Sequence, residues 1–206
     1  MFYSILDKKR LALLPLFKAF KNDFYLAGGT GLALQLGYRD SIDFDFFSKK
    51  EFKTDKLFLQ IKKVFKEYKI VKIIEDQNTL TIMVDKTVKI SFFGYPYKLI
   101  DELIDQPYLK IASIRDIACM KISAIVSRAT NKDYIDLYFI FKKLSLKKIL
   151  KDLVKKFPDL DANLALKSLV HFDDIIMGDI RFKNNQNVDF KTVRGFIEKE
   201  VTKISK

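Results

Sequence analysis

The sequence predicts an α+β protein in which an N-terminal lobe, built on a mixed β-sheet flanked by helices, packs on a C-terminal helical lobe. Short apolar runs separated by turn residues, typical of strands, are concentrated before about residue 100. From about residue 113 the apolar residues recur at helical spacing instead. No linker or internal repeat stands out, so we expect residues 1–110 to form the α/β lobe and residues 111–206 to complete its cleft.

The N-terminal lobe is expected to begin with helical residues 4–20, interrupted by Pro15. "FYLAG" is typical of a short buried strand, "TGLALQLG" of a short helix ending at Gly37, and "IDFDFF" of a second strand. A helix is expected at about 54–68. The strands "YKIVKIIED", "TLTIMVD" and "TVKISFFG" follow, with turns at Gln77-Asn78 and Asp85-Lys86, and this order predicts a β-meander.

The C-terminal lobe is expected to begin at "SIRD", which has the form of a capping box and opens a helix through Val126. Further helices are expected at about 132–143, 146–157, 163–171 and 190–204, and "KNNQN" is a polar loop. Cys119 lies in an apolar stretch of the first of these helices and is expected in the core.

The composition excludes several classes of protein and site. With one cysteine and one histidine, the chain can form neither an internal disulfide nor a Cys-based zinc cluster, so a bound metal would need oxygen ligands. No run of apolar residues is long enough to span a membrane and no leader is evident, so we expect a cytoplasmic protein without a membrane partner. The net charge of +12 suits a polyanionic partner, but 32 of the 38 basic residues are lysines, which genome composition explains equally well.

One stretch, "YLAGGTGLALQLGYRDSIDFDFF", combines a glycine turn with two aspartates. Gly28 and Gly29 allow a ligand to approach the backbone, and the helix that follows offers unpaired N–H groups to a phosphate. Strand alternation directs Asp43 and Asp45 to one face, where two like charges favour a magnesium or manganese ion between them. The alternative is a tight strand–helix turn followed by a surface strand.

Three residues near these motifs are further candidates for nucleotide binding. Thr30 adds a hydroxyl beside the glycines. Arg39 and Ser41 precede the aspartates, where they would either steady the loop or contact a phosphate.

A second segment, "MKISAIVSRATNKDYIDLYFIF", carries charged residues at regular spacing. Lys121 and Arg128 are seven residues apart, so on one helix they would share a face and present two cations to a polyphosphate. Asp133 and Asp136 are about one turn apart in the next helix, where one could orient the lysine or act as a base. The alternative is helix capping and surface ion pairing.

Together these two segments resemble the polymerase-β-type nucleotidyltransferase superfamily, and more narrowly the AbiEii/AbiGii toxin family of bacterial toxin–antitoxin and phage-abortive-infection systems. The resemblance spans about residues 20–141 and rests on G-G-T, R-x-S-x-D-x-D, K-h-x-A and K-D-x-x-D. It implies that the metal ligands are Asp43 and Asp45. It implies a catalytic set of Asp43, Asp45, Lys121, Asp133 and Asp136, and nucleotide contacts from Gly28, Gly29, Thr30, Arg39, Ser41, Ser91, Lys121 and Arg128.

The chain departs from the superfamily pattern at one position. Many such enzymes carry a third carboxylate on a neighbouring strand, and here "TVKISFF" has Ser91 at that place. A serine is a poor base at neutral pH. The base would then be Asp133 or Asp136, or the metal alone would activate the nucleophile, or activity would be reduced.

The resemblance implies a metal-dependent enzyme that moves a nucleoside monophosphate from an NTP, with GTP as a candidate, to an acceptor hydroxyl on RNA or tRNA. It also implies a toxin with a cognate antitoxin. The alternatives are a module of the same fold that binds a nucleotide or RNA without turnover, and a transferase that modifies protein.

Overall fold

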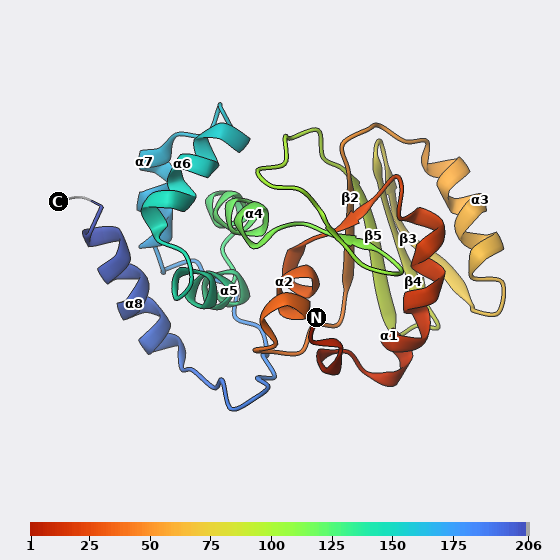
Figure 1. Ribbon diagram of the computed structural model, residues 1–206, viewed down its shortest axis with the longest axis horizontal. Helices are drawn as coiled ribbons and strands as arrows, with labels where there is room; N and C mark the ends of the chain where they lie inside the picture. Colours follow the sequence, from red (N-terminus) through yellow and green to blue (C-terminus); the bar gives the residue numbers. More distant parts are fainter. Residues whose placement is uncertain (205–206) are drawn as a thin grey trace.

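The computed structural model describes residues 1–204, in which seven strands form one mixed sheet in the order β3-β4-β5-β2-β1-β7-β6. The central strand β2 runs parallel to β5 and antiparallel to β1, while β1 runs parallel to β7. Helices gather beside this sheet and beyond its β1 side (Figure 1), so the predicted fold class is confirmed. The strand bounds are Tyr25–Leu26 (β1), Phe44–Ser48 (β2), Ile70–Asp76 (β3), Thr79–Val84 (β4), Val88–Gly94 (β5), Ile104–Asp105 (β6) and Lys110–Ile111 (β7).

The meander β3–β4–β5 forms as its turns predict. Asn78, Asp85 and Lys86 have positive φ angles, which Asn and Asp adopt readily in tight hairpin turns. β6 and β7 were not predicted, because each has two residues and neither is fully buried, whereas the equally short β1 is buried and lies in an apolar run.

One face of the sheet forms the N-terminal core. Phe44 and Phe46 are 0% and 1% exposed on this face, and the ring of Phe17 lies 4.8 and 4.9 Å from theirs. Phe17 belongs to the 3₁₀ helix η2, which follows α1, and α3 covers the β3–β4 side. The bounds are Tyr3–Ile5 (η1), Lys8–Leu13 (α1), Leu14–Phe20 (η2), Gly28–Leu36 (α2) and Thr54–Val64 (α3).

The C-terminal half contains helices whose starts are marked by polar caps. The side chains of Ser113, Thr130, Ser145, Asp161 and Asp189 each accept a bond from a backbone N–H of the helix that follows. These helices pack around α4 and α5, and α2 lies between them and the sheet (Figure 1). The bounds are Ile114–Ser127 (α4), Asn131–Phe141 (α5), Leu146–Lys156 (α6), Ala162–Leu169 (α7) and Phe190–Thr202 (α8).

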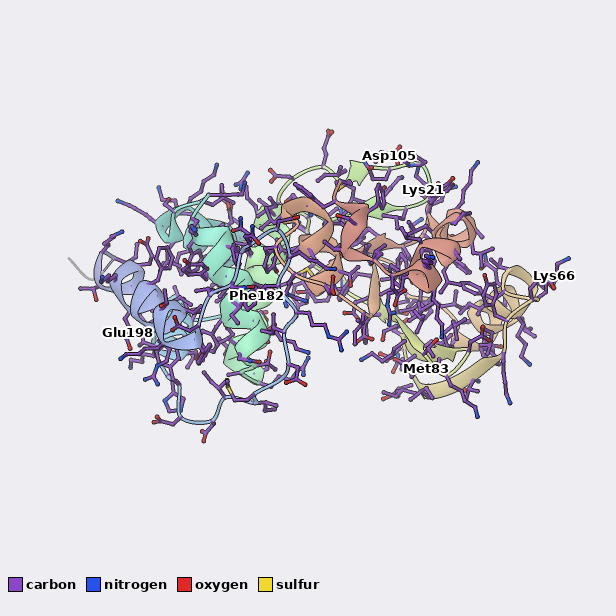
Figure 2. All side chains as sticks on the ribbon, turned by 90° about the horizontal axis from the view of Figure 1, so that it is seen from below. Lys21, Lys66, Met83, Asp105, Phe182 and Glu198 are labelled. Atoms are coloured by element: carbon purple, nitrogen blue, oxygen red, sulfur yellow. The ribbon has the colours of Figure 1, made fainter. Side chains whose placement is uncertain are left out.

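The connection between α7 and α8, residues 170–189, is called the strap here because it bonds to both halves of the molecule. Ile176 exchanges backbone bonds with Ala129 and Asn131 in the C-terminal half. Further along, Arg181 accepts a bond from the backbone N–H of Asp40. Figure 2 shows Phe182 near the middle of the molecule, between the two halves. None of the helices in the described chain is long and apolar enough to cross a membrane.

Candidate functional site

The glycine turn joins β1 to α2 and lies directly against the aspartate strand. Gly28 has φ +61°, a backbone conformation that favours glycine, and a Cβ added there would lie 3.1 Å from Asp45 Oδ2. A Cβ added at Gly29 would overlap the guanidinium of Arg39. α2 has no side-chain cap, so no capping side chain occupies the N–H groups of its first turn. The Asp45 carboxylate lies close to this helix start, beside Gly28. Gly28 is therefore brought to Asp45, and Gly29 to Arg39 and Ser41.

Asp45 lies on β2 and Asp43 directly precedes the strand, so alternation predicts that both face the same side. Phe44 and Phe46 point into the core, which leaves Asp43 and Asp45 on the opposite face. Burial and the neighbouring charge of Asp43 raise the pKa of Asp45, while Lys89, Lys121 and Arg128 act in the opposite direction. Asp45 thus carries a negative charge that its surroundings do not fully compensate.

β5 lies beside the aspartates and supplies Ser91 and Lys89. Ser91 is directly opposite Asp45 in the parallel pairing, which is the position expected for a third carboxylate. It is 3% exposed and its hydroxyl accepts a bond from Thr81, 3.2 Å away. Lys89 Nζ lies 2.9 Å from Asp43 Oδ2. Lys89 was not predicted as a site residue, although strand alternation places it two residues before Ser91 on the same face.

Two hydroxyl groups connect the loop before β2 to α2. The hydroxyls of Thr30 and Ser41 lie 2.6 Å apart, and Thr30 also donates to the carbonyl oxygen of Asp43. Both side chains are buried. The backbone at the first aspartate is therefore held by the glycine-led helix itself.

A buried ion network lies behind the aspartates. Asp136 is 0% exposed, and its carboxylate receives the Arg39 Nε and Nη2 groups at 2.8 and 3.0 Å and Lys121 Nζ at 2.7 Å. The Tyr38 hydroxyl donates to the same carboxylate. Burial alone would raise the pKa of Asp136, but the two cations outweigh it and lower that pKa to about 2. Asp136 is therefore fully ionised and enclosed.

Lys121 joins this network to Asp133. Its Nζ lies 2.7 Å from Asp133 Oδ1, and its pKa is raised because Asp136 and Asp133 outweigh the effect of burial. The other oxygen of Asp133 accepts a bond from Thr130 at 2.8 Å. Both aspartates of α5 thus orient the lysine, which is one of the two roles expected for them. Arg128 is exposed and lies beyond the end of α4, in an extended conformation, so it does not share a helical face with Lys121.

Arg39 bonds through all three nitrogens of its guanidinium to partners within the protein. Besides Asp136, it donates from Nη1 to the carbonyl oxygen of Asp40, 2.9 Å away. The geometry agrees with the expectation that Arg39 steadies the loop. The strap adds to this, because Lys183 bonds through its backbone N–H to Tyr38 and through Nζ to Asp40 at 3.2 Å. Neither Tyr38 nor the strap was identified from the sequence.

The aspartate pair has the chemistry of a divalent-cation site. Two carboxylates side by side, one with a raised pKa, are the oxygen donors that Mg²⁺ or Mn²⁺ prefers. Within residues 1–204, no group of three or more His, Cys, Asp and Glu side chains converges. The donors fit an ion that takes its remaining ligands from water and from phosphate oxygens.

Comparisons with known proteins identify the family of the chain. Residues 15–192 match a family model described as nucleotidyl transferase AbiEii toxin, type IV TA system. The uncharacterized protein aq_aa25 of Aquifex aeolicus (strain VF5) is 40% identical over 159 residues, which cover 74% of this chain and 75% of that protein.

Two solved structures share the fold. MenT4, the nucleotidyltransferase toxin Rv2826c of Mycobacterium tuberculosis H37Rv, has a TM-score of 0.62 and 14% identity, covering 95% of this chain and 82% of that one. JHP933 from Helicobacter pylori has a TM-score of 0.59 and 19% identity, covering 96% and 89%. At these identities the likeness establishes a common fold.

Proposed function

The chain belongs to the AbiEii nucleotidyl transferase toxin family, and from that premise we propose that it transfers a nucleoside monophosphate from an NTP to a hydroxyl of an RNA acceptor. The family resemblance read from the sequence is thereby confirmed. We propose GTP as the first nucleotide to test and tRNA as the first acceptor. The protein would be the toxin of a toxin–antitoxin pair. It would act in the cytoplasm and be inhibited there by a cognate antitoxin.

One observation carries this proposal: the carboxylate of Asp45 lies against the glycine turn at the uncapped start of α2, and Thr30 of that helix bonds to the backbone of Asp43. The N–H groups of Gly28 and Gly29 would bind the triphosphate at the helix N-terminus. Asp43 and Asp45 would hold Mg²⁺ or Mn²⁺. When bound, such an ion supplies charge neutralisation for the reacting phosphates and the pyrophosphate that leaves.

The remaining site residues divide into those that contact substrate and those that position them. Lys121 is 11% exposed at its side chain and acts electrostatically on Asp45, so we propose that it faces the nucleotide phosphates. Arg128, which is exposed beside the same carboxylate, is proposed as a second phosphate ligand. Arg39 and Asp136 are proposed as positioning residues, since they bond to each other and Arg39 also bonds to the backbone of the loop before β2.

The hydroxyls near the aspartates are proposed as secondary contacts. Thr30 and Ser41 fix the backbone of Asp43 and border the phosphate site. Ser91 lies opposite Asp45 and can bond to a phosphate or to a water molecule.

The general base remains a choice between Asp133 and activation by the metal alone. Asp136 is disfavoured because its carboxylate is enclosed and its pKa is about 2, so it holds protons poorly at neutral pH. Asp133 is 9% exposed at its side chain, but both oxygens have partners in Lys121 and Thr130. It could accept a proton only after one of these bonds is released.

The direct test is transfer of label from NTPs that carry the radioactive phosphorus at the α-position. Purified protein is incubated with each labelled NTP, Mg²⁺ or Mn²⁺, and total tRNA. The Asp43→Ala/Asp45→Ala variant should transfer no label. The matched control, Asp23→Ala/Asp159→Ala, removes two exposed aspartates outside the site and should transfer label as the native protein does.

The outcome also separates the alternatives. Label on protein instead of RNA would identify a protein acceptor. Nucleotide binding without transfer, under every NTP and metal tested, would favour a binding module, for which the serine at position 91 is the supporting observation. Growth arrest on expression, relieved by the double aspartate substitution and not by the control, would support the toxin role.

A further inference from the structure

Lys89 lies on the face of the sheet that carries the aspartates. Its neighbours in β5, Val88 and Ile90, are 2% and 0% exposed, so alternation turns Lys89 to the opposite side, with Ser91. The parallel pairing of β2 with β5 then brings Lys89 beside Asp43, and Nζ lies 2.9 Å from Oδ2. The two side chains are 42% and 36% exposed.

The ion pair between Lys89 and Asp43 affects the binding of ligands more than the stability of the fold. An exposed lysine–carboxylate pair contributes little to folding, so the fold does not require it. Asp43, however, is one of two carboxylates that would bind a divalent cation. A cation that binds at Asp43 must share the carboxylate with Lys89 or displace it. The local charge of the site is thus reduced from two negative charges to one.

We propose that Lys89 makes the site selective for a metal–nucleotide complex over a free metal ion. Bound to Asp43, it weakens the affinity of the aspartate pair for a free divalent cation. When a metal–nucleotide complex enters, Lys89 leaves Asp43 and binds the polyphosphate. This inference deepens the proposed function and rests on it for the nucleotide.

The chemistry of the lysine suits both positions. Its ammonium group is a compact charge on a flexible four-carbon stem, so Nζ can move while β5 stays fixed. Lysine ammonium groups are common ligands of phosphate. Ser91 also contributes, because a carboxylate at that position would restore the negative charge that Lys89 removes. With two carboxylates opposed by Lys89, and by Lys121 and Arg128 near Asp45, most of the attraction for the metal has to come from the nucleotide phosphates.

The first measurement is the binding of Mn²⁺ without nucleotide, followed by electron paramagnetic resonance of the free ion. The Lys89→Met variant should bind Mn²⁺ about tenfold more tightly than the native protein, since a unit charge a few ångströms from the ion is removed. Lys89→Arg keeps the charge and should bind as weakly as the native protein. Lys66→Met removes an exposed lysine at the far end of the molecule (Figure 2) and should also have no effect.

The second measurement is the binding of an α,β-methylene analogue of GTP in the presence of saturating Mn²⁺. Here Lys89→Met should bind about tenfold more weakly, because one phosphate ligand is lost. The two effects have opposite signs, which a purely structural role of the lysine does not produce. Lys89→Gln provides a second neutral variant, and thermal melting of each protein confirms that it is folded.

The proposal is overturned if both neutral variants bind free Mn²⁺ as the native protein does, or if both affinities change in the same direction. Failure of the proposed function is a different result: no label transfer and no nucleotide binding by the native protein. The first measurement requires neither nucleotide binding nor label transfer. A gain in Mn²⁺ affinity would therefore support the competition between Lys89 and the metal even if the native protein showed neither activity.

Discussion

Replacing Asp136 with asparagine should destabilise the protein strongly, because it removes the charge that compensates two buried cations. The carboxylate is 0% exposed and contacts both Arg39 and Lys121. Breaking a buried ion pair by neutralising one partner typically costs about 3–5 kcal/mol, most of it from the charge left unpaired. Lys121 keeps Asp133 as a partner, so we expect the lower end of that range, about 3 kcal/mol.

The pH dependence of stability gives an independent check on the same group. The pKa of Asp136 is about 2 in the folded protein, against an ordinary value of 3.8. An acid whose pKa is lowered by folding stabilises the protein above its unfolded pKa and loses that contribution as the pH falls through the folded value. The native protein should therefore lose about 2 kcal/mol of stability through this group between about pH 4 and pH 2, and the Asp136→Asn variant should not.

The assay is urea unfolding followed by circular dichroism, at neutral pH and through the acidic range. Asp40→Asn is the matched control, since it makes the same chemical change in a partly exposed pair with Lys183 and should cost less than about 1 kcal/mol. If Asp136→Asn costs no more than this control, or if the difference between native protein and variant stays constant down to about pH 2, the buried network does not have the energetic role assigned to it.

Three further predictions concern the aspartate strand, the glycine turn and the cysteine. Asp45→Asn should abolish label transfer yet raise the melting temperature, because burial and Asp43 raise the pKa of Asp45 and make its charged form unfavourable; a lower melting temperature would contradict this. Gly28→Ala should cost about 1–2 kcal/mol in urea unfolding, since alanine is strained at φ +61° and its Cβ approaches Asp45. Cys119 is buried and burial raises its pKa to about 12, so a thiol reagent should label it in denaturant and leave it unmodified in the folded protein.

The parts of the site that follow local rules could be predicted from the sequence. Alternation alone places Asp43 and Asp45 on one face of β2, because the phenylalanines between them have to be buried. The meander could also be predicted, since Asn78 and Asp85 in its turns are residues that tolerate a positive φ. Helix starts were marked by polar caps such as Ser113.

The parts that depend on distant pairing could not be predicted. Lys89 was visible as a residue of β5, but only the parallel pairing of β5 with β2 places it at Asp43. Arg39 and Asp136 are 97 residues apart, and no local pattern links them. The strap has no apolar periodicity, and its course between the two halves depends on backbone bonds and on pairings with distant residues, such as that of Lys183 with Asp40.

The loop before β2 connects these observations, because both halves of the chain determine its position. Arg39 is held from α5 by Asp136, and Asp40 is held from the strap by Arg181 and Lys183. Asp43 follows three residues later and receives the hydroxyl of Thr30 at its backbone. The two carboxylates belong to the N-terminal half, but residues of the C-terminal half hold the loop that precedes them. The two hydrophobic clusters do not follow the expected lobe boundary either, since the cluster under the C-terminal helices also holds Tyr25 and Tyr38. We therefore propose that the two lobes form a single functional unit.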